Sequence, residues 1–537
     1  MGDGGEILAT ALLLLLASPL LGAATLLALR KAALPSLRQL LVVNLVLTAL
    51  TATAVTALSV SVEQRAESTW RNTTLRVAAW SVPGRVSDQP PWWTVTLSVG
   101  VDRLNRAPLC WLAWGALAAG LITRGQSPES SGRYAALLAL EAAWLWTYAA
   151  QDGVLFLGAL VTAGVMMAML TAYWGREDRR AAAARLWRWW LIADGLLLLG
   201  LLGLANAAVW SQQHLVGVLP PLSMTWEMIA EKLPRITMHN QSAAQYWAVS
   251  AGWWVWPLVL VAAIRSGVPP FHSAVVQWWE QVSAPVGVLT LLGGLPLGWY
   301  LWIRLLSPIF VTELYEQGAV LAGWGALATL GAGMLCLAQN EGRPFAAWFS
   351  LAGVSLAWFL LSSGDKSAWD AGVSFAWGSA ALLALVGILD GRASDPRTTT
   401  GHGLWSSMPR WSAAMLVTIG SLVGFPAAAR WVLDWQLAWR MAGARPGPFF
   451  VAMTGWLIAG WAAVWMLQRW LWSASATDSE RPTRSADTAI EDLRPSEAAA
   501  IVILLVWLGL LASGWLTAAL DVVPDAADQR PAGGAAP

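Results

Sequence analysis

The sequence predicts an all-α polytopic membrane protein with about fourteen transmembrane helices. Of its 537 residues, 57% are hydrophobic and only 12% are charged, whereas about one-quarter of the residues in a soluble chain are charged. Apolar segments close to the ~20 residues that cross a bilayer recur along the whole chain. Two of these segments are interrupted by glycine and proline, and proline cannot continue a helix without a break.

The apolar segments leave two longer polar stretches between them. The second connection, 62–106, is expected to form an external loop, and a polar linker at 472–496 precedes the last segment. The first segment is too long, and too poor in basic residues at its start, to be a cleaved signal peptide. The spans are expected at about residues 6–28, 37–61, 107–123, 133–150, 153–174, 187–211, 247–265, 284–306, 316–338, 344–362, 368–390, 410–440, 449–471 and 497–520.

Basic residues gather in the connections on one side of this fourteen-span arrangement. The positive-inside rule assigns that side to the cytoplasm, so both termini and the long external loop face outward. The expected location is the bacterial inner (cytoplasmic) membrane. The residues concerned are Arg30, Lys31, Arg38, Arg176, Arg179, Arg180, Arg185, Arg392, Arg397, Arg410, Arg481, Arg484 and Arg494.

Composition excludes several classes of function. The net charge of +1 gives no sign of a nucleic-acid partner. Cys110 and Cys336 are far apart in apolar segments and are expected in the core. No cluster of Cys or His could hold an iron–sulfur centre, a haem or a zinc ion, and no glycine-rich phosphate loop follows a strand pattern. We therefore expect no metal and no cofactor, and any redox chemistry must belong to a partner.

The first interrupted segment is a candidate functional site. Gly267, Pro269 and Pro270 break the helix, Arg265 precedes the break, and His272 follows it. At membrane depth a broken helix is tolerated only where it packs in protein or lines a water-filled cavity, and a basic residue beside it is a functional candidate. Alternatively, the helix ends at the interface and Arg265 reaches the headgroups. His272 is either a helix-end residue bonded to backbone or a proton donor.

The second interruption surrounds Pro426 in the segment SLVGFPAAAR (421–430). If spans four to eight and nine to thirteen form two five-helix repeats, both breaks fall in the fourth helix of a repeat. Interrupted helices at corresponding positions of two halves indicate an ion or substrate pathway in a transporter. The alternative is coincidence, because proline is frequent in membrane helices.

Further candidates are the ionisable residues inside spans. Glu141 lies in the fourth span, Asp194 in the sixth, and Arg430 and Asp434 follow the second break. A charge at the bilayer centre costs at least ~2.5–3.5 kcal/mol, so each of these residues should face the bundle interior and have a partner. Arg430 and Asp434 are four residues apart and can pair on one helix face. For each acid the alternative is a neutral or hydrogen-bonded structural group.

Several separated motifs resemble one family. The chain is similar to the antiporter-like, proton-translocating subunits of respiratory complex I and of Mrp-type cation/proton antiporters, most of all to the M-type subunits of NADH-quinone oxidoreductase. The motifs are LSVGVDRLNRA at 97–107, the fifth-span pattern at 152–175, Arg265 with Pro270-Phe271-His272 and Ala284-Pro285-Val286, LAQNEGRPFAAWFSLAG at 337–353, and the segment with Met-Pro and Gly-Phe-Pro at 408–434.

The resemblance implies two inverted five-helix repeats. It also implies a subunit without a redox centre of its own, whose partners are other membrane subunits, the lipid bilayer, and protons or monovalent cations. In order, the regions are an N-terminal region at 1–132 with three spans and the external loop, the repeats at 133–306 and 316–471, a cytoplasmic linker at 472–496, a C-terminal span at 497–520 and a disordered tail at 521–537.

The chain departs from the family along the proton path. In the family, a Glu in span five pairs with a Lys in span seven, and further Lys and His residues lead to an acid in span twelve. The corresponding positions here are Val161, Arg265, Pro296 or a neighbour, Gly353, Trp377 and Asp434.

These differences leave several hypotheses open. Arginine stays protonated in proteins, so Arg265 cannot relay a proton, and Arg430 should hold Asp434 ionised. The subunit either conducts protons by a shortened, water-based route that uses Glu141, Asp434 and Asp194, or it is a non-conducting structural part of a complex. The parent assembly is either of the complex I type or of the Mrp type. An independent solute carrier or a lipid-processing enzyme is a further alternative, but no polar catalytic cluster supports the enzyme.

Overall fold

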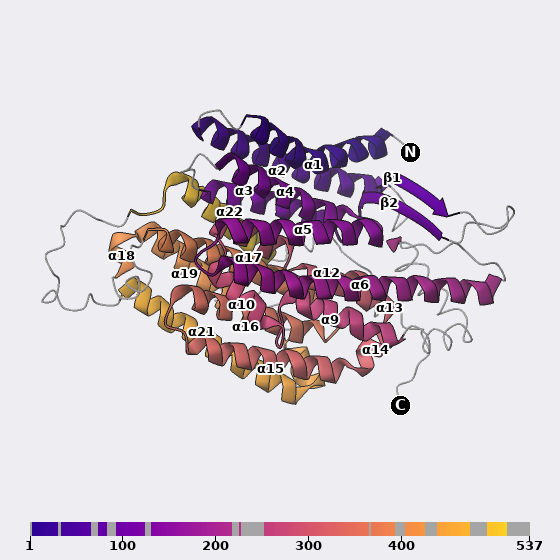
Figure 1. Ribbon diagram of the computed structural model, residues 1–537. Coiled ribbons are helices and arrows are strands. Elements are labelled where there is room, and N and C mark those ends of the chain that lie inside the picture. The colour runs from indigo at the N-terminus through magenta and orange to yellow at the C-terminus, as the bar shows by residue number, and fades with distance from the viewer. Residues whose placement is uncertain are drawn as a thin grey trace, which may run out of the picture.

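The protein folds as a bundle of long helices that lie side by side along one common direction, with one β-hairpin at an end of the bundle (Figure 1). A helix satisfies its backbone hydrogen bonds within one segment, which is the condition that a bilayer imposes on such an apolar chain. Pro426, Arg430 and Asp434 lie outside the described residues. The computed structural model describes residues 3–29, 34–65, 73–82, 93–123, 130–216, 225–226, 252–364, 367–392, 403–424, 438–472 and 491–512.

Within these residues, nine helices are long and apolar enough to cross a membrane, and three further apolar helices are shorter. The chain is therefore a mostly helical, multi-pass membrane protein. Nine is fewer than the fourteen predicted spans, partly because charged residues reduce the apolar character of some segments. One example is the fourth helix, which contains Arg133 and Glu141. The number fourteen stays a prediction.

The first part of the bundle contains six long helices and the hairpin. Its two strands are antiparallel, with an irregularity in register between Arg76 and Ala78. The hairpin lies within the connection 62–106, where a loop without strands is predicted from the sequence. In order, the elements are α1 (Asp3–Ala28), α2 (Leu34–Arg65), β1 (Thr73–Val82), β2 (Trp93–Val101), α3 (Arg106–Ile122), α4 (Ser130–Ala149), α5 (Gly153–Trp174) and α6 (Arg179–Val216).

The second part contains the broken helices. Helix α15 packs closely on α16 and α21, and α17 packs on α11 and α22. In order, the elements are η2 (Gly252–Trp254), α9 (Val255–Ser266), α10 (His272–Gln281), α11 (Ala284–Gly293), α12 (Leu297–Leu301), a π-helical segment η3 (Trp302–Leu306), α13 (Ser307–Ile309), α14 (Val311–Glu316), α15 (Gly318–Leu337), α16 (Gly342–Leu361), α17 (Ser367–Asp390), α18 (Leu404–Ser407), α19 (Pro409–Val423), α21 (Pro446–Trp472) and α22 (Pro495–Ala512).

Both predicted interruptions coincide with glycines in the left-handed region. Helix α9 ends at Gly267, which has a φ of 71°, and the Pro269–Pro270 peptide that follows is cis. Helix α19 ends at Gly424, which has a φ of 92°, two residues before Pro426. Glycine adopts this conformation without the steric cost that a Cβ would add, so it commonly ends a helix. In the structure, α9 thus ends at Gly267 and α10 begins at His272.

Helices α15 and α21 approach each other through glycine. A Cβ added to Gly455 would lie 2.5 Å from the backbone N and Cα of Leu330 on α15. Small residues allow such backbone approach between membrane helices, where van der Waals packing holds helices together. This contact fixes the outer edge of the second part of the bundle.

Candidate functional site at the broken helix

Arg265 forms a buried ion pair with Asp194. Arg265 lies in the last turn of α9, directly before the break, and its Nη2 donates to Oδ1 of Asp194 on α6. The side chain of Arg265 is 0% exposed and that of Asp194 is 7% exposed. Arg265 therefore does not reach the lipid headgroups. A charge in such a place requires a counter-charge, because an isolated buried ion is strongly disfavoured.

An aromatic ring completes the surroundings of the guanidinium. The Cζ of Arg265 lies 4.7 Å from the ring centroid of Trp190. Trp190 precedes Asp194 by four residues, so both side chains leave the same face of α6. The ring face attracts a cation, and this attraction is strongest where water is excluded. Helix α6 thus supplies both the anion and the aromatic contact for the cation of α9.

Glycines on α6 explain why α9 lies so close. A Cβ added to Gly200 would lie 2.7 Å from Cδ2 of Leu258 on α9. At Gly203 an added Cβ would overlap the indole of Trp254, which precedes α9. These two glycines therefore leave room against α6 for Leu258 of α9 and for Trp254 directly before it. The close packing places the end of α9 beside Asp194.

The break itself packs in protein. The indole Nε1 of Trp324, on α15, donates to the carbonyl oxygen of Pro269. Gly267 faces Val275 of α10, because a Cβ added to the glycine would lie 2.8 Å from Cγ2 of that residue. His272 begins α10, and its ring centroid lies 5.3 Å from that of Trp348 on α16. The break thus contacts helices from the second part of the bundle, while Pro270 itself is exposed and Pro269 and His272 are partly buried.

Glu141 is a second buried acid. Its side chain on α4 is 0% exposed, and among the described residues neither carboxyl oxygen has a hydrogen-bond partner. Trp144 follows three residues later on the same face of α4, and its ring meets that of Trp190 edge to face at 6.2 Å. Glu141 therefore shares a helix face with the indole that contacts the Arg265–Asp194–Trp190 group.

A second ion pair was not among the predicted site residues. Nη1 of Arg304 lies 2.6 Å from Oδ2 of Asp102, and both side chains are buried. Nη2 of Arg304 donates to Oε1 of Gln151 at 3.0 Å. The backbone amides of Leu104 and Asn105 donate to Oδ1 of Asp102 at 2.9 and 2.8 Å. The pair therefore joins the end of β2 to the π-helical segment η3.

The sequence contained part of the signal for this pair. Asp102 belongs to the motif LSVGVDRLNRA, which by itself assigns no role to the acid. Arg304 lies near the end of a predicted span, where an arginine commonly reaches the headgroups. A π-helical turn inside an α-helix frequently marks a functional site, but residue order alone does not reveal it. The partner of Arg304 could not be identified without the fold.

Aromatic side chains connect the two ion pairs. The Cζ of Arg304 lies 5.6 Å from the ring centroid of Tyr300, and Tyr300 meets Tyr148 of α4 edge to face at 5.0 Å. Tyr148 follows Trp144 by four residues on α4, and Trp144 meets the Trp190 that contacts Arg265. One face of α4 thus contacts the surroundings of both buried arginines.

The turn between α4 and α5 is held by β2. Asp152 is the N-cap of α5 and accepts hydrogen bonds from the backbone amides of Leu155 and Ser98, each at 2.7 Å. Burial raises the pKa of the Asp152 carboxyl above its ordinary value, although these hydrogen bonds act to lower it. Val99 forms an isolated β-bridge with Ala150. The hairpin is therefore fixed to the turn that supports Gln151.

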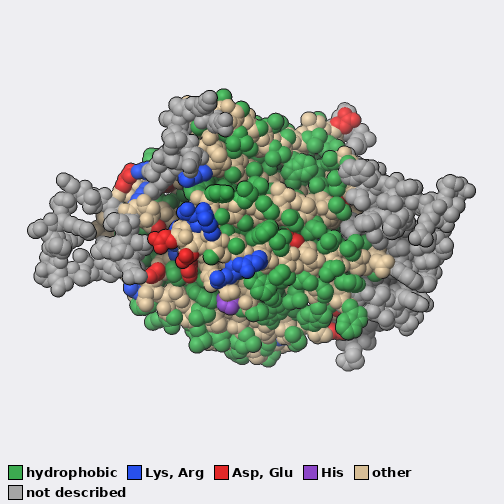
Figure 2. Space-filling model, in the orientation of Figure 1, with side chains coloured by type: hydrophobic (Ala, Val, Ile, Leu, Met, Phe, Trp, Pro, Cys, Tyr) green, Lys and Arg blue, Asp and Glu red, His purple; other side chains and the backbone are tan. Residues whose placement is uncertain are grey.

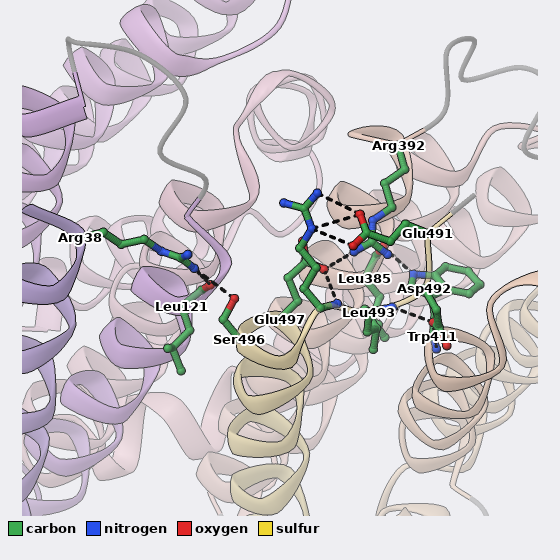
Figure 3. Close-up of polar contacts among 11 residues, drawn as sticks. Arg38, Leu121, Leu385, Arg392, Trp411, Glu491, Asp492, Leu493, Ser496 and Glu497 are labelled. Atoms are coloured by element: carbon green, nitrogen blue, oxygen red, sulfur yellow. Dashed lines mark hydrogen bonds and ion pairs between the residues drawn. The ribbon is translucent and has the colours of Figure 1, made fainter. Parts of the chain in front are cut away.

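At the opposite end of the bundle, polar contacts gather around the start of α22 (Figure 3). Glu497 forms a buried ion pair with Arg392, which follows α17. Ser496 accepts a hydrogen bond from Nη2 of Arg38 on α2 at 3.0 Å. Asp492 accepts from two backbone amides in the first turn of α19 at 3.0 and 3.2 Å. This region joins α2, α17 and α19, which are distant in sequence.

The described residues contain no group of three or more His, Cys, Asp and Glu side chains that could hold a metal ion. Cys110 and Cys336 are both buried and free.

The chain matches a protein family and individual members of known membrane complexes. Residues 150–459 match the family described as NADH:quinone oxidoreductase/Mrp antiporter, TM. NADH-quinone oxidoreductase subunit M of Rickettsia prowazekii (strain Madrid E) is 23% identical over 310 residues, which are 57% of each chain. The subunit M of Rickettsia felis is 23% identical over 278 residues, or 50% of each chain. The chain thus spans about half the length of these relatives.

Solved structures share the fold over nearly the whole chain. Respiratory complex I from Thermus thermophilus with bound NADH contains a chain with a TM-score of 0.70 and 17% identity, covering 95% of this chain and 97% of that one. A chain of the Mrp complex from Dietzia sp. DQ12-45-1b has a TM-score of 0.71 and 17% identity. The match covers 97% of this chain and 96% of that one. A chain of the membrane-bound sulfane sulfur reductase, an archaeal respiratory membrane complex, has a TM-score of 0.67 and 16% identity. The match covers 93% of this chain and 75% of that one.

Proposed function

Because the chain belongs to the NADH:quinone oxidoreductase/Mrp antiporter family of membrane subunits, we propose that it works as an antiporter-like subunit of a complex that translocates protons or monovalent cations. The similar solved chains belong to multisubunit membrane complexes, which supports other membrane subunits as partners. The complex I type is the first candidate, because the matched curated relatives are M-type subunits of NADH-quinone oxidoreductase. The Mrp type is the alternative. We propose no nucleic-acid partner.

The finer architecture belongs to the same proposal. We propose fourteen spans in a bacterial inner membrane, with both termini outside, and two inverted five-helix repeats with breaks in spans seven and twelve. The proposed regions are 1–132, the repeats at 133–306 and 316–471, the cytoplasmic linker at 472–496, the last span at 497–520 and the tail at 521–537. The end of α9 at Gly267 and the end of α19 at Gly424 support corresponding breaks in the two repeats.

The observation that carries the proposal is the Arg265–Asp194 pair beside the broken helix. By the family resemblance, the cation of span seven would have its counter-charge on span five, but Val161 occupies that position. Here α6 supplies the acid instead. The chain thus keeps a buried, neutralised cation at the break while the acid has moved to another helix.

Glu141 is the proposed proton-holding group. Arg265 stays protonated, so it can bias a neighbouring proton site by its charge but cannot itself relay a proton. A buried carboxyl without a hydrogen-bond partner among the described residues can hold a proton as the neutral acid, and Glu141 has these surroundings. Asp194 is already paired with Arg265. Asp434 with Arg430, and His272 beside the break, are the further proposed members of the path.

A second candidate function is a non-conducting structural subunit. The same ion pair favours it, because two groups that remain charged and paired form a fixed link between α6 and α9 instead of a proton relay. The two candidates differ in proton flux but agree on assembly into a complex.

The deciding experiment combines purification with flux. The protein is solubilised mildly from its native membrane, co-purifying chains are identified, and the intact assembly is reconstituted in liposomes. Quinone-reducing subunits would support the complex I type, and small hydrophobic antiporter subunits the Mrp type. Proton flux that falls in Glu141→Gln would support conduction, and an assembly without flux would support the structural candidate. A chain that purifies alone and folded would contradict the subunit proposal.

A further inference from the structure

Helix α6 has an exposed face whose chemistry changes along its length. Arg180, Arg185 and Arg188 are exposed in its first turns; we call these three residues the arginine face. With 3.6 residues per turn they lie within about 140° of one another around the helix axis. On the same side, three residues beyond Arg188, the exposed residues become aliphatic. These are Leu191, Ile192, Leu198 and Leu199, which are 36%, 50%, 40% and 53% exposed.

This change indicates the depth of the membrane boundary. Residues 179–207 of α6 are long and apolar enough to span a bilayer. Arg188 and Leu191 are separated by about 4.5 Å along the axis, because each residue adds 1.5 Å. Trp187 and Trp189, which are partly buried, flank Arg188, and tryptophan favours the membrane–water interface. The arginine face therefore lies at headgroup level, and the aliphatic residues lie at the level of the acyl chains.

The arginine face is free to bind an anion. Among the residues that the structure describes, no carboxylate forms an ion pair with Arg180, Arg185 or Arg188. Arg188 donates its Nε to the carbonyl oxygen of Ala184 in the preceding turn at 3.2 Å. Neighbouring Arg176, in contrast, is paired with Asp390. Glu177 and Asp178 lie before the helix, so the stretch 176–188 has five arginines and two acids.

The wider surface agrees with this placement. Figure 2 shows charged side chains gathered toward one end of the visible face, whereas hydrophobic side chains cover its middle. A guanidinium group binds phosphate with two parallel hydrogen bonds, which makes arginine suited to a phosphate headgroup. Gly195 lies on the same side of α6, and a Cβ added there would meet no atom within 4 Å. An acyl chain can therefore approach the helix closely below the arginines.

We propose that the arginine face binds the phosphate headgroup of an anionic phospholipid, with the acyl chains along Leu191, Ile192, Leu198 and Leu199. A protein partner would not require the change from arginine to aliphatic side chains at one depth, whereas a single lipid molecule has this order of groups. Binding rests on the guanidinium groups and not on the helix N-terminus, which the acids Glu177 and Asp178 precede. The proposal is independent of whether the subunit conducts protons.

The test measures lipid retention by the full chain. The purified, delipidated protein is incubated in detergent with phosphatidylglycerol or phosphatidylcholine, and bound lipid is counted by native mass spectrometry. We expect the wild type to retain phosphatidylglycerol and not phosphatidylcholine. Arg185→Gln/Arg188→Gln should bind phosphatidylglycerol about 30-fold more weakly, which corresponds to ~1 kcal/mol for each arginine near a membrane surface. Added salt should weaken the wild-type binding.

The control is Arg410→Gln/Arg494→Gln, which removes the same charge from exposed residues outside the arginine face; of the two, Arg494 forms a surface ion pair with Glu491. It should retain phosphatidylglycerol like the wild type. An unchanged melting temperature in both double variants would show that each has folded. Equal retention of phosphatidylglycerol by both variants would overturn the proposal, and so would equal binding of the two lipids by the wild type. Loss of a co-purifying subunit with unchanged lipid retention would instead assign the face to a protein partner.

Discussion

Asp194 neutralises Arg265 from α6, although the family pattern would place the acid on the neighbouring helix α5. Both side chains are buried at the point where α9 breaks, and the guanidinium also contacts the ring of Trp190. The function of the break depends on whether this pair remains fixed or exchanges a proton, and the following predictions address the pair and its surroundings.

Removing the acid of this pair should destabilise the protein. In Asp194→Asn, Arg265 keeps its charge without a buried counter-ion, which typically costs ~3–5 kcal/mol. We expect a lower melting temperature in detergent. The double variant Asp194→Asn/Arg265→Gln removes both charges and should recover most of the loss. A single variant as stable as the wild type would contradict the assigned ion pair.

Arg265→Lys should introduce a group that can exchange its proton. Lysine lowers its pKa when buried, whereas arginine stays protonated. If the fixed charge of Arg265 limits conduction, reconstituted Arg265→Lys protein will show faster proton flux than the wild type in a pH-sensitive dye assay. Arg265→Gln, which cannot hold a charge, provides the comparison. Equal flux in the lysine variant and the wild type would show that this position does not limit transport.

Glu141→Gln should lower proton flux without changing the stability of the protein. The amide has nearly the shape of the neutral acid, so the melting temperature should change little. Proton flux should fall if Glu141 holds the transported proton. Glu177→Gln makes the same chemical change at an exposed position and should alter neither property. A flux that is normal in Glu141→Gln would remove this residue from the proposed path.

Arg304→Gln should weaken the attachment of the β1–β2 hairpin and leave the Arg265–Asp194 ion pair intact. Asp102 would lose its partner in a buried environment, and breaking such a pair costs ~3–5 kcal/mol. We expect faster hydrogen exchange in β2 and in the turn between α4 and α5, where Gln151 and Asp152 lie. Exchange near Arg265 should stay unchanged. Faster exchange throughout the bundle would indicate global destabilisation and not a local link.

Gly455→Ala should weaken the packing of α21 on α15. The added Cβ would lie 2.5 Å from the Leu330 backbone. Such overpacking typically lowers the free energy of unfolding by ~1–3 kcal/mol. Gly509→Ala on α22 is the matched control, because a Cβ there meets no atom within 4 Å. It should be neutral or stabilising, since alanine restricts the unfolded chain more than glycine does. Similar melting temperatures for the two variants would contradict the close helix contact.

Local chemistry made parts of this structure predictable. Gly267 with Pro269 and Pro270 indicated a break, because proline removes a backbone donor and glycine permits a positive φ. The cost of a charge in the bilayer predicted that Glu141 faces the interior and has a partner; it is buried, but among the described residues its carboxyl oxygens have no hydrogen-bond partner. Such features depend only on residues close together in the chain, so sequence patterns can reveal them.

The pairing of distant residues was not predictable in the same way. Nothing in the spacing of Asp194 and Arg265 shows that α6 and α9 pack together at Gly200, and a similar argument applies to Asp102 and Arg304. The hairpin of β1 and β2 was missed because its alternating residues lie inside a connection read as a loop. Arg430, Asp434 and Pro426 lie outside the described residues, so their roles stay predictions.

The contacts around α22 also bear on how the chain is made. Arg392 leaves the ribosome 105 residues before its partner Glu497, an interval of roughly 5–20 s at ordinary rates of synthesis. During that time its guanidinium has no Glu497 to pair with, and the surfaces of α3 and α17 that later contact α22 are uncovered. Until α22 has been synthesised, the Arg392 guanidinium and these surfaces of α3 and α17 must therefore contact water, lipid or the insertion machinery. Completion of the bundle is in this sense a late event of biosynthesis.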